Sequence, residues 1–125
     1  MAQILYSREH EYVRVEGEEG VVGISDHAQA QLGDVVFAEV PPVGKKLKQG
    51  DAAAVVESVK AASDVFAPAS GEVIAVNSEV ESTPGLINED ALVKGWLFRL
   101  KLADPKELSG LMDEAAYAEF VKSAG

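Results

Sequence analysis

Lys60 stands out because of the residues around it. The segment 55–66 contains two short apolar runs that meet at this lysine, and only small residues, Ala61 to Ser63, follow directly. A lysine at the tip of a tight hairpin, with small neighbours, is accessible to an enzyme that binds the chain and acylates the amine. We therefore interpret the chain as the carrier of a covalent arm attached at Lys60.

Side-chain alternation along the first of these runs predicts the direction of Lys60. In a strand, Val56, Ser58 and Lys60 share one face and the intervening residues share the other. The tip lacks Asn-Gly, so we do not predict the two-residue mirror-type turn that hairpins favour. Considered alone, the segment also fits an ordinary solvated loop lysine, so the interpretation depends on the rest of the chain.

Short segments with the alternation or apolar content of strands must position this hairpin. They are residues 12–15, 21–24, 34–40, 52–59, the segment that follows Lys60 and ends at residue 66, 71–76 and 96–102. Between the second and third, Ser25 and Gly33 are the expected N-cap and C-cap of a short helix near 25–32. Ile24, Ala28 and Leu32 fall on one face of that helix. Residues 78–90 are expected to be irregular, with one helical turn.

A weak internal repeat relates two parts of the chain. Gly33-Asp34-Val35-Val36 resembles Gly71-Glu72-Val73-Ile74, and each is followed by a turn-rich connection and another strand. The repeat indicates two similar β halves packed face to face, joined by the Lys60 hairpin. Many short strands with regular turn signals predict a small sandwich or flattened barrel.

The pattern becomes helical after residue 102. Asp104 is followed by a proline and by Glu107, which are the signals of an N-cap, a first helical position and a capping-box glutamate. Asp113 is the expected cap of a second helix, with Met112 and Tyr117 at the positions of a hydrophobic staple. We expect these C-terminal helices, near 104–122, to lie over the sheet.

The composition indicates one domain. The chain has 125 residues, of which 47% are hydrophobic and 26% charged, as in an ordinary globular protein. We therefore expect a single carrier domain over 1–125, with a core of about 6–102 and a helical extension of 103–125. The net charge of −10 argues against nucleic acid and anionic membranes as partners and suits a monomeric shuttle.

The chain contains no cysteine, so any thiol chemistry must be brought in on a cofactor. No metal is expected, because His10 and His27 are too isolated for a site that needs three or four converging ligands. We interpret each histidine as a surface or packing residue. Neither a secretory signal nor an Arg-rich transit peptide is recognisable at the start, so we expect a cytoplasmic protein, or a mitochondrial-matrix protein whose transit peptide has been removed.

The segment Glu57-Ser58-Val59-Lys60-Ala61-Ala62-Ser63-Asp64 resembles the lipoylation site of the glycine cleavage system H-protein family. Further matching segments follow in the family's order and spacing: 10–13, 22–28, 32–37, 68–73, 86–88 and 95–97. The resemblance covers nearly the whole chain, roughly from Tyr6 to Phe120. It implies a mainly β fold of the lipoyl/biotinyl (barrel-sandwich hybrid) type, with lipoate in amide linkage to Lys60.

The resemblance also implies a non-catalytic carrier that visits three enzymes. A pyridoxal-phosphate glycine decarboxylase loads an aminomethyl group onto a sulfur of the arm. An aminomethyltransferase releases ammonia and passes the one-carbon unit to tetrahydrofolate. A dihydrolipoyl dehydrogenase then reoxidises the dithiol with NAD as acceptor, and a lipoate-attachment enzyme must modify the lysine beforehand.

The loaded arm can be degraded by water, so the resemblance implies a pocket that limits water and holds the ammonium end by charge-assisted hydrogen bonds. By the same resemblance, Glu11 and Asp64 are the candidate carboxylates of that pocket. The alternative is a pair of surface carboxylates, one of which ends a turn. Glu9 and Gln31 stand where many relatives have serine and some have histidine, respectively.

Other functions fit parts of the sequence. A lipoyl domain of a 2-oxoacid dehydrogenase usually has an acidic residue where Val59 stands, and a biotinyl domain has methionines in place of Val59 and Ala61. An H-like protein that relays lipoyl groups to other enzymes would have the same attachment site. An independent enzyme is not indicated, because no nucleophile stands at a recognisable spacing from a base.

Overall fold

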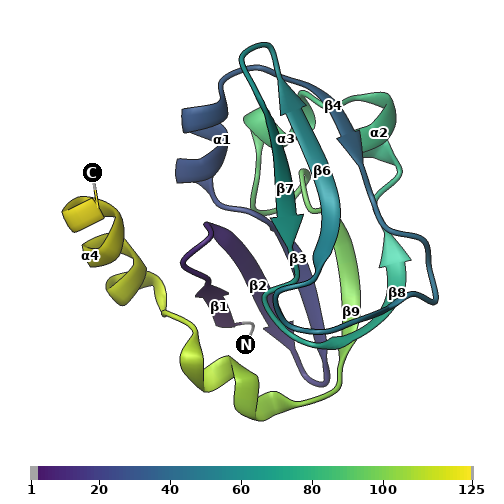
Figure 1. The fold of residues 1–125 in the computed structure, drawn as a ribbon, viewed down its shortest axis with the longest axis vertical. Coiled ribbons are helices and arrows are strands. Elements are labelled where there is room, and N and C mark those ends of the chain that lie inside the picture. The colour runs from purple at the N-terminus through teal and green to yellow at the C-terminus, as the bar shows by residue number, and fades with distance from the viewer. Residues whose placement is uncertain (1–2, 125) are drawn as a thin grey trace.

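The computed structural model describes residues 3–124, whose strands form two antiparallel sheets (Figure 1). The larger sheet has the order β1-β2-β3-β9-β8-β5. Its strands are β1 (Gln3–Tyr6), β2 (Glu11–Glu16), β3 (Glu19–Ile24), β5 (Lys46–Leu47), β8 (Gly71–Val76) and β9 (Phe98–Leu102). The smaller sheet has the order β4-β6-β7, with β4 (Val35–Glu39), β6 (Ala52–Ser58) and β7 (Ala62–Phe66).

The core lies between the two sheets. Val56 and Val65 of the smaller sheet are buried in one cluster with Val22, Phe98 and Leu100 of the larger sheet. Buried residues alternate with partly buried ones along β6 from Ala53 to Ser58, as expected for a strand that buries one face. The expected mainly β sandwich is therefore confirmed. Both sheets are open at their ends, so the fold is a sandwich of two sheets rather than a closed barrel.

The internal repeat is visible in the strands. β4 and β8 each contain a register shift at the same position of the repeat, between Val35 and Phe37 and between Val73 and Ala75. The two copies lie in different sheets, as expected. The Lys60 hairpin lies between the two copies in the chain, and its strands β6 and β7 pair with each other within the smaller sheet.

The first helix follows its sequence signals closely. α1 (Asp26–Leu32) begins after Ser25, whose side chain accepts a hydrogen bond from the Ala28 N–H. It ends at Gly33, which has φ of 84° and donates its N–H to the Gln29 carbonyl. The segment 78–90 contains two short helices, α2 (Glu79–Ser82) and α3 (Leu86–Glu89), rather than a single turn.

The C-terminal segment contains a 3-10 helix, η1 (Pro105–Gly110), and α4 (Glu114–Ala124). Asp104 and Asp113 cap them as predicted, by accepting from the Lys106 and Ala116 N–H groups. The predicted capping-box role of Glu107 is wrong. Its carboxylate instead accepts hydrogen bonds from the backbone N–H and hydroxyl of Ser70, which tie η1 to the loop before β8.

A tyrosine cluster attaches α4 to the larger sheet. Tyr6 of β1 and Tyr117 of α4 stack with their ring centroids 4.2 Å apart. Tyr12 of β2 is fully buried in the same cluster and donates its hydroxyl to the Ala91 carbonyl at 2.8 Å. Met112 and Tyr117 both belong to this cluster, in agreement with the expected staple. The described part of the chain has no helix with the length and apolar character to cross a bilayer.

Candidate functional site

The hairpin of β6 and β7 projects at one end of the molecule beside α1 (Figure 1). Lys60 lies in the exposed tip of this hairpin. Within residues 3–124 its amine forms no ion pair, because the salt bridges involve only Arg14 and Arg99. The Lys60 amine is therefore accessible and has no ion-pair partner among the described residues.

Ser58 holds the tip in place. Its Oγ accepts hydrogen bonds from the Lys60 and Ala61 N–H groups, each at 3.1 Å, and its own N–H donates to the Ala61 carbonyl at 2.8 Å. Neither Val59 nor Lys60 has positive φ, so the turn is not of the mirror type, as predicted. Ser58 was given no role from the sequence, although a serine at the start of a turn is a recognised signal.

Val56 and Ser58 are buried, and Lys60 is exposed beyond the end of β6 at Ser58, so its predicted direction stays a prediction. The Lys60 side chain lies against Gly33, so close that a Cβ added to this glycine would come within 3.3 Å of the lysine Cε. The end of α1 thus gives the lysine stem a surface that a side chain at position 33 would fill.

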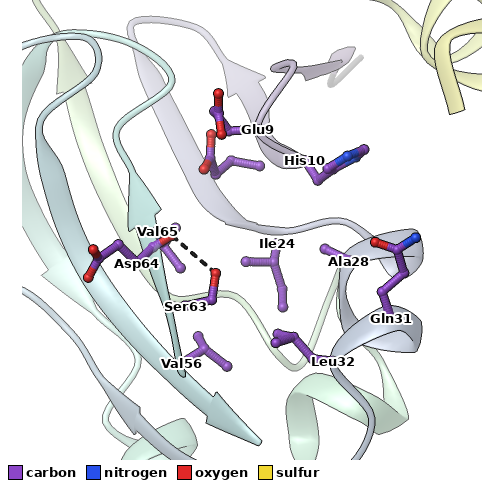
Figure 2. Close-up of a pocket in the computed structure, with 11 residues that line it drawn as sticks. Glu9, His10, Ile24, Ala28, Gln31, Leu32, Val56, Ser63, Asp64 and Val65 are labelled. Atoms are coloured by element: carbon purple, nitrogen blue, oxygen red, sulfur yellow. Dashed lines mark hydrogen bonds between the residues drawn. The ribbon is translucent and has the colours of Figure 1, made fainter. Parts of the chain in front are cut away.

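A cavity of about 290 Å³ opens beside this hairpin (Figure 2). It is lined by residues from the β1–β2 turn, from β3 with α1, and from β6 with β7. They are Glu9, His10, Glu11, Ile24, Ala28, Gln31, Leu32, Val56, Ser63, Asp64 and Val65. The predicted face of Ile24, Ala28 and Leu32 forms its apolar wall. Glu9 and Gln31 both lie on its lining.

Glu11 is the buried carboxylate of this cavity, with 2% of its surface exposed. Its Oε1 accepts from the Ser7 hydroxyl at 2.5 Å, and its Oε2 accepts from the Phe66 N–H at 3.2 Å. Burial raises the pKa of Glu11, while the hydrogen bonds from Ser7 and Phe66 act in the opposite direction. Glu11 therefore links β2 to β7 as well as lining the cavity.

Asp64 lies on the same cavity but is oriented differently. Figure 2 shows its carboxylate directed away from Ile24 and Leu32, whereas Ser63 reaches into the space. Asp64 is exposed, and it also lines a second hollow beside Glu39 and Glu81. The structure thus brings both predicted carboxylates to one cavity but directs only Glu11 into the protein.

His10 adopts an unusual backbone conformation, with φ of 68°. Its Nδ1 lies 2.7 Å from the Tyr117 hydroxyl, and that hydroxyl lies 2.7 Å from Ser25 Oγ. His10 and His27 lie with ring centroids 5.0 Å apart, but no group that could hold a metal ion is present in the described residues. Both histidines are partly buried, so the interpretation of His10 as a packing residue fits its contacts.

A family model described as glycine cleavage H-protein matches residues 4–124. The chain belongs to this family. It is 63% identical over 118 residues to the glycine cleavage system H protein of Beijerinckia indica, an alignment that covers 94% of this chain and 95% of that protein. It is 60% identical to the H protein of Parvibaculum lavamentivorans, with 98% of each chain covered.

A solved structure gives the same result for the fold. The crystal structure of a glycine cleavage system H protein from Mycobacterium marinum superimposes with a TM-score of 0.88 at 31% identity, covering 96% of this chain and 97% of that one. The protein is thus a lipoyl-bearing shuttle of the glycine cleavage system, and its partners belong to that system. The lipoyl-relay and 2-oxoacid dehydrogenase alternatives are not favoured.

Proposed function

We propose that Lys60 is the lipoyl attachment residue and that the cavity beside its hairpin shelters the cationic end of the cargo. The observation that carries this proposal is the accessible amine of Lys60 on a tip braced by Ser58. The return strand of the same hairpin contributes Ser63, Asp64 and Val65 to the cavity. The attachment point and one wall of the cavity therefore belong to the same hairpin, which raises the effective concentration of the arm's end near the cavity.

The residues present fit a lipoyl group. The amine is exposed and unpaired with any carboxylate of residues 3–124, and Gly33 leaves room beside the lysine stem. When attached, the group supplies a dithiol whose sulfur carries the aminomethyl unit between enzymes. The protein's own contribution is to hold the arm clear of the surface, to exclude water with Ile24 and Leu32, and to offer carboxylates to a cationic amine.

We further propose the partners and setting that the family implies. They are a pyridoxal-phosphate glycine decarboxylase, a tetrahydrofolate-dependent aminomethyltransferase, dihydrolipoyl dehydrogenase and a lipoate-attachment enzyme. The chain catalyses none of their steps and acts as a monomer of one domain. The lack of cysteine suits a reducing compartment such as the cytoplasm.

Replacing Lys60 tests the attachment site. Lys60→Arg keeps the positive charge but removes the acylatable amine, so incubation with a lipoate ligase and lipoate is expected to leave its intact mass unchanged. Lys48→Arg is the matched control, because Lys48 is also an exposed lysine in a turn. The control is expected to gain one lipoyl group, as the unaltered protein does. A lipoyl adduct on Lys60→Arg would reject the proposed site.

Replacing the carboxylates tests the cavity. Glu11→Gln keeps the shape but removes the charge, so ammonia release from the loaded arm is expected to become about tenfold faster, which corresponds to the loss of one charge-assisted hydrogen bond. Asp64→Asn is expected to have a smaller effect, because its carboxylate is directed away from the apolar wall. Glu72→Gln on the exposed face of β8 is the control. Equal release rates for all variants would remove the cavity from the proposal.

A further inference from the structure

The turn between β1 and β2 contains a histidine at a position that favours glycine. Arg8, Glu9 and His10 form a three-residue loop, closed by hydrogen bonds from the Ser7 N–H to the Glu11 carbonyl at 2.8 Å and from the His10 N–H to the Ser7 carbonyl at 3.1 Å. The last residue of such a loop has positive φ, which glycine adopts without steric cost. His10 takes this place with φ of 68°. Histidine is one of the non-glycine residues found more often at positive φ, and contacts with neighbouring elements offset the remaining steric cost.

Two helices hold His10. From α4, the Tyr117 hydroxyl lies 2.7 Å from Nδ1, and Phe120 lies with its ring centroid 5.8 Å from that of His10. From the start of α1, Ser25 donates its N–H to the His10 carbonyl at 2.9 Å. The Ser25 hydroxyl also lies 2.7 Å from the Tyr117 hydroxyl. Ser25 therefore contacts the backbone of His10, Tyr117 contacts its ring, and the two residues contact each other.

The charges around His10 favour a neutral ring. Burial and the neighbouring His27 of α1 lower the pKa of His10, and only Glu9 of its own turn acts in the opposite direction. Glu11 on β2 and Tyr117 on α4 are the other titratable groups near this contact. A neutral ring keeps Nδ1 available to the Tyr117 hydroxyl without adding a positive charge beside the cavity.

His10 separates the two carboxylates that the turn contributes to the cavity, Glu9 and Glu11. Figure 2 shows the His10 ring directed away from Val56 and Ser63, on the other side of the turn from Glu9. The peptide units on either side of His10 are shared with Glu9 and Glu11, so a shift of the His10 backbone moves both residues, although Ser7 and Phe66 also hold the Glu11 carboxylate.

We propose that Tyr117 is a positioning residue for the cavity, acting through His10 to hold the turn so that Glu9 and Glu11 face the cargo. This inference rests on the proposed function of the cavity. Under this proposal, α4 helps to protect the cargo of the arm. α4 lies outside the β-sandwich and contributes no residue to the cavity lining.

The first test uses the protein without lipoate. Tyr117→Phe removes only the hydroxyl, and amide hydrogen exchange by NMR is expected to be about fivefold faster at His10 and Glu11, as for the loss of one hydrogen bond. Tyr6→Phe is the matched control, because it removes the hydroxyl of the stacked ring, for which the described residues provide no hydrogen-bond partner. Equal exchange at these two amides in both variants would overturn the inference.

The second test uses lipoylated protein loaded by glycine decarboxylase. Tyr117→Phe and His10→Ala are each expected to release ammonia several-fold faster than the unaltered protein. The double variant is expected to be no faster than His10→Ala alone, because under this inference the Tyr117 hydroxyl acts through His10. If the two effects multiply in the double variant, Tyr117 acts by another route and the inference fails.

Glu11→Gln separates the two proposals. If Glu11→Gln accelerates release but Tyr117→Phe does not, the positioning role of Tyr117 is rejected and the cavity proposal stands. If neither accelerates release, the cavity proposal itself is rejected. Unfolding free energies of Tyr117→Phe and Tyr6→Phe, measured in urea, show whether a difference in release follows from general destabilisation.

Discussion

At the scale of single residues, two polar groups with opposite environments define the site. Lys60 is exposed, and its hydrogen bonds in the described residues come from its backbone, which leaves its amine free to react. Glu11 is almost completely buried and bonded through both carboxylate oxygens. A buried carboxylate attracts a cation strongly because little water competes for it, whereas an exposed lysine can be reached by a partner's active site.

The raised pKa of Glu11 leads to a prediction about stability. The folded protein retains the Glu11 proton at pH values at which the unfolded chain, with an ordinary pKa of about 4.5, has lost it. The stabilising contribution of Glu11 is therefore complete below pH 4.5 and is lost as the pH rises through the folded-state pKa. Relative to Glu11→Gln, the unaltered protein is expected to lose unfolding free energy from pH 4.5 towards neutrality. Urea titrations of both proteins at several pH values check this, and parallel pH profiles would contradict it.

At the scale of elements, α1 connects the parts of the site. Its N-cap Ser25 contacts the His10–Tyr117 pair, and its middle contributes Ala28 and Leu32 to the cavity. Its C-cap Gly33 lies under the Lys60 stem. The helix is only seven residues long, so its position depends on these caps and on its packed face rather than on helical propensity.

The C-cap gives a prediction for Gly33. With φ of 84° and ψ of −154°, this residue lies in a region that is essentially restricted to glycine. Gly33→Ala is expected to lower the unfolding free energy by about 1–3 kcal/mol, mainly through backbone strain, because the flexible Lys60 side chain can move. Gly85→Ala, at a position with ordinary φ and no atoms within 4 Å of a new Cβ, is the control and is expected to be nearly neutral. Chemical denaturation measures both, and similar effects would contradict the assignment of strain to Gly33.

At the scale of the whole molecule, one core joins the two sheets. Val65 of the hairpin strand and Leu100 of the larger sheet belong to the same buried cluster. The Lys60 hairpin is therefore not an independent appendage, since its inner face contributes to the sandwich. This arrangement supports our expectation of a single domain, of which residues 1, 2 and 125 lie outside the described part.

A shared core predicts cooperative unfolding. Leu100→Ala is expected to cost about 2–5 kcal/mol and Val65→Ala somewhat less, and each is expected to shift one common transition. Trp96 fluorescence and far-UV circular dichroism should give coincident curves for both variants. Separate transitions for the two sheets would contradict the single-domain expectation.

Local signals in the sequence predicted much of the fold. Ser25 and Gly33 marked the ends of α1, Asp104 and Asp113 capped the C-terminal helices, and the alternation of β6 marked its buried face. These features depend on residues within a few positions of one another. The resemblance around Lys60 identified the family, because the order and spacing of its motifs can be read from the chain alone.

Other features of the site required the tertiary structure. Glu107 bonds to Ser70 rather than to its own helix, and the Lys60 side chain lies against Gly33 of another segment. Tyr117 meets His10 across 107 positions of sequence.

The sequence by itself determined the helix caps and the apolar stripes, because short-range sterics and hydrogen bonding decide them, and it predicted Lys60 as the attachment residue through the family resemblance. Only the packing of distant segments decided that Glu11 is the buried carboxylate, where the cavity opens, and that Tyr117 contacts His10 beside it. Those outcomes depend on which surfaces the folded chain brings into contact, and no local pattern in the sequence records them.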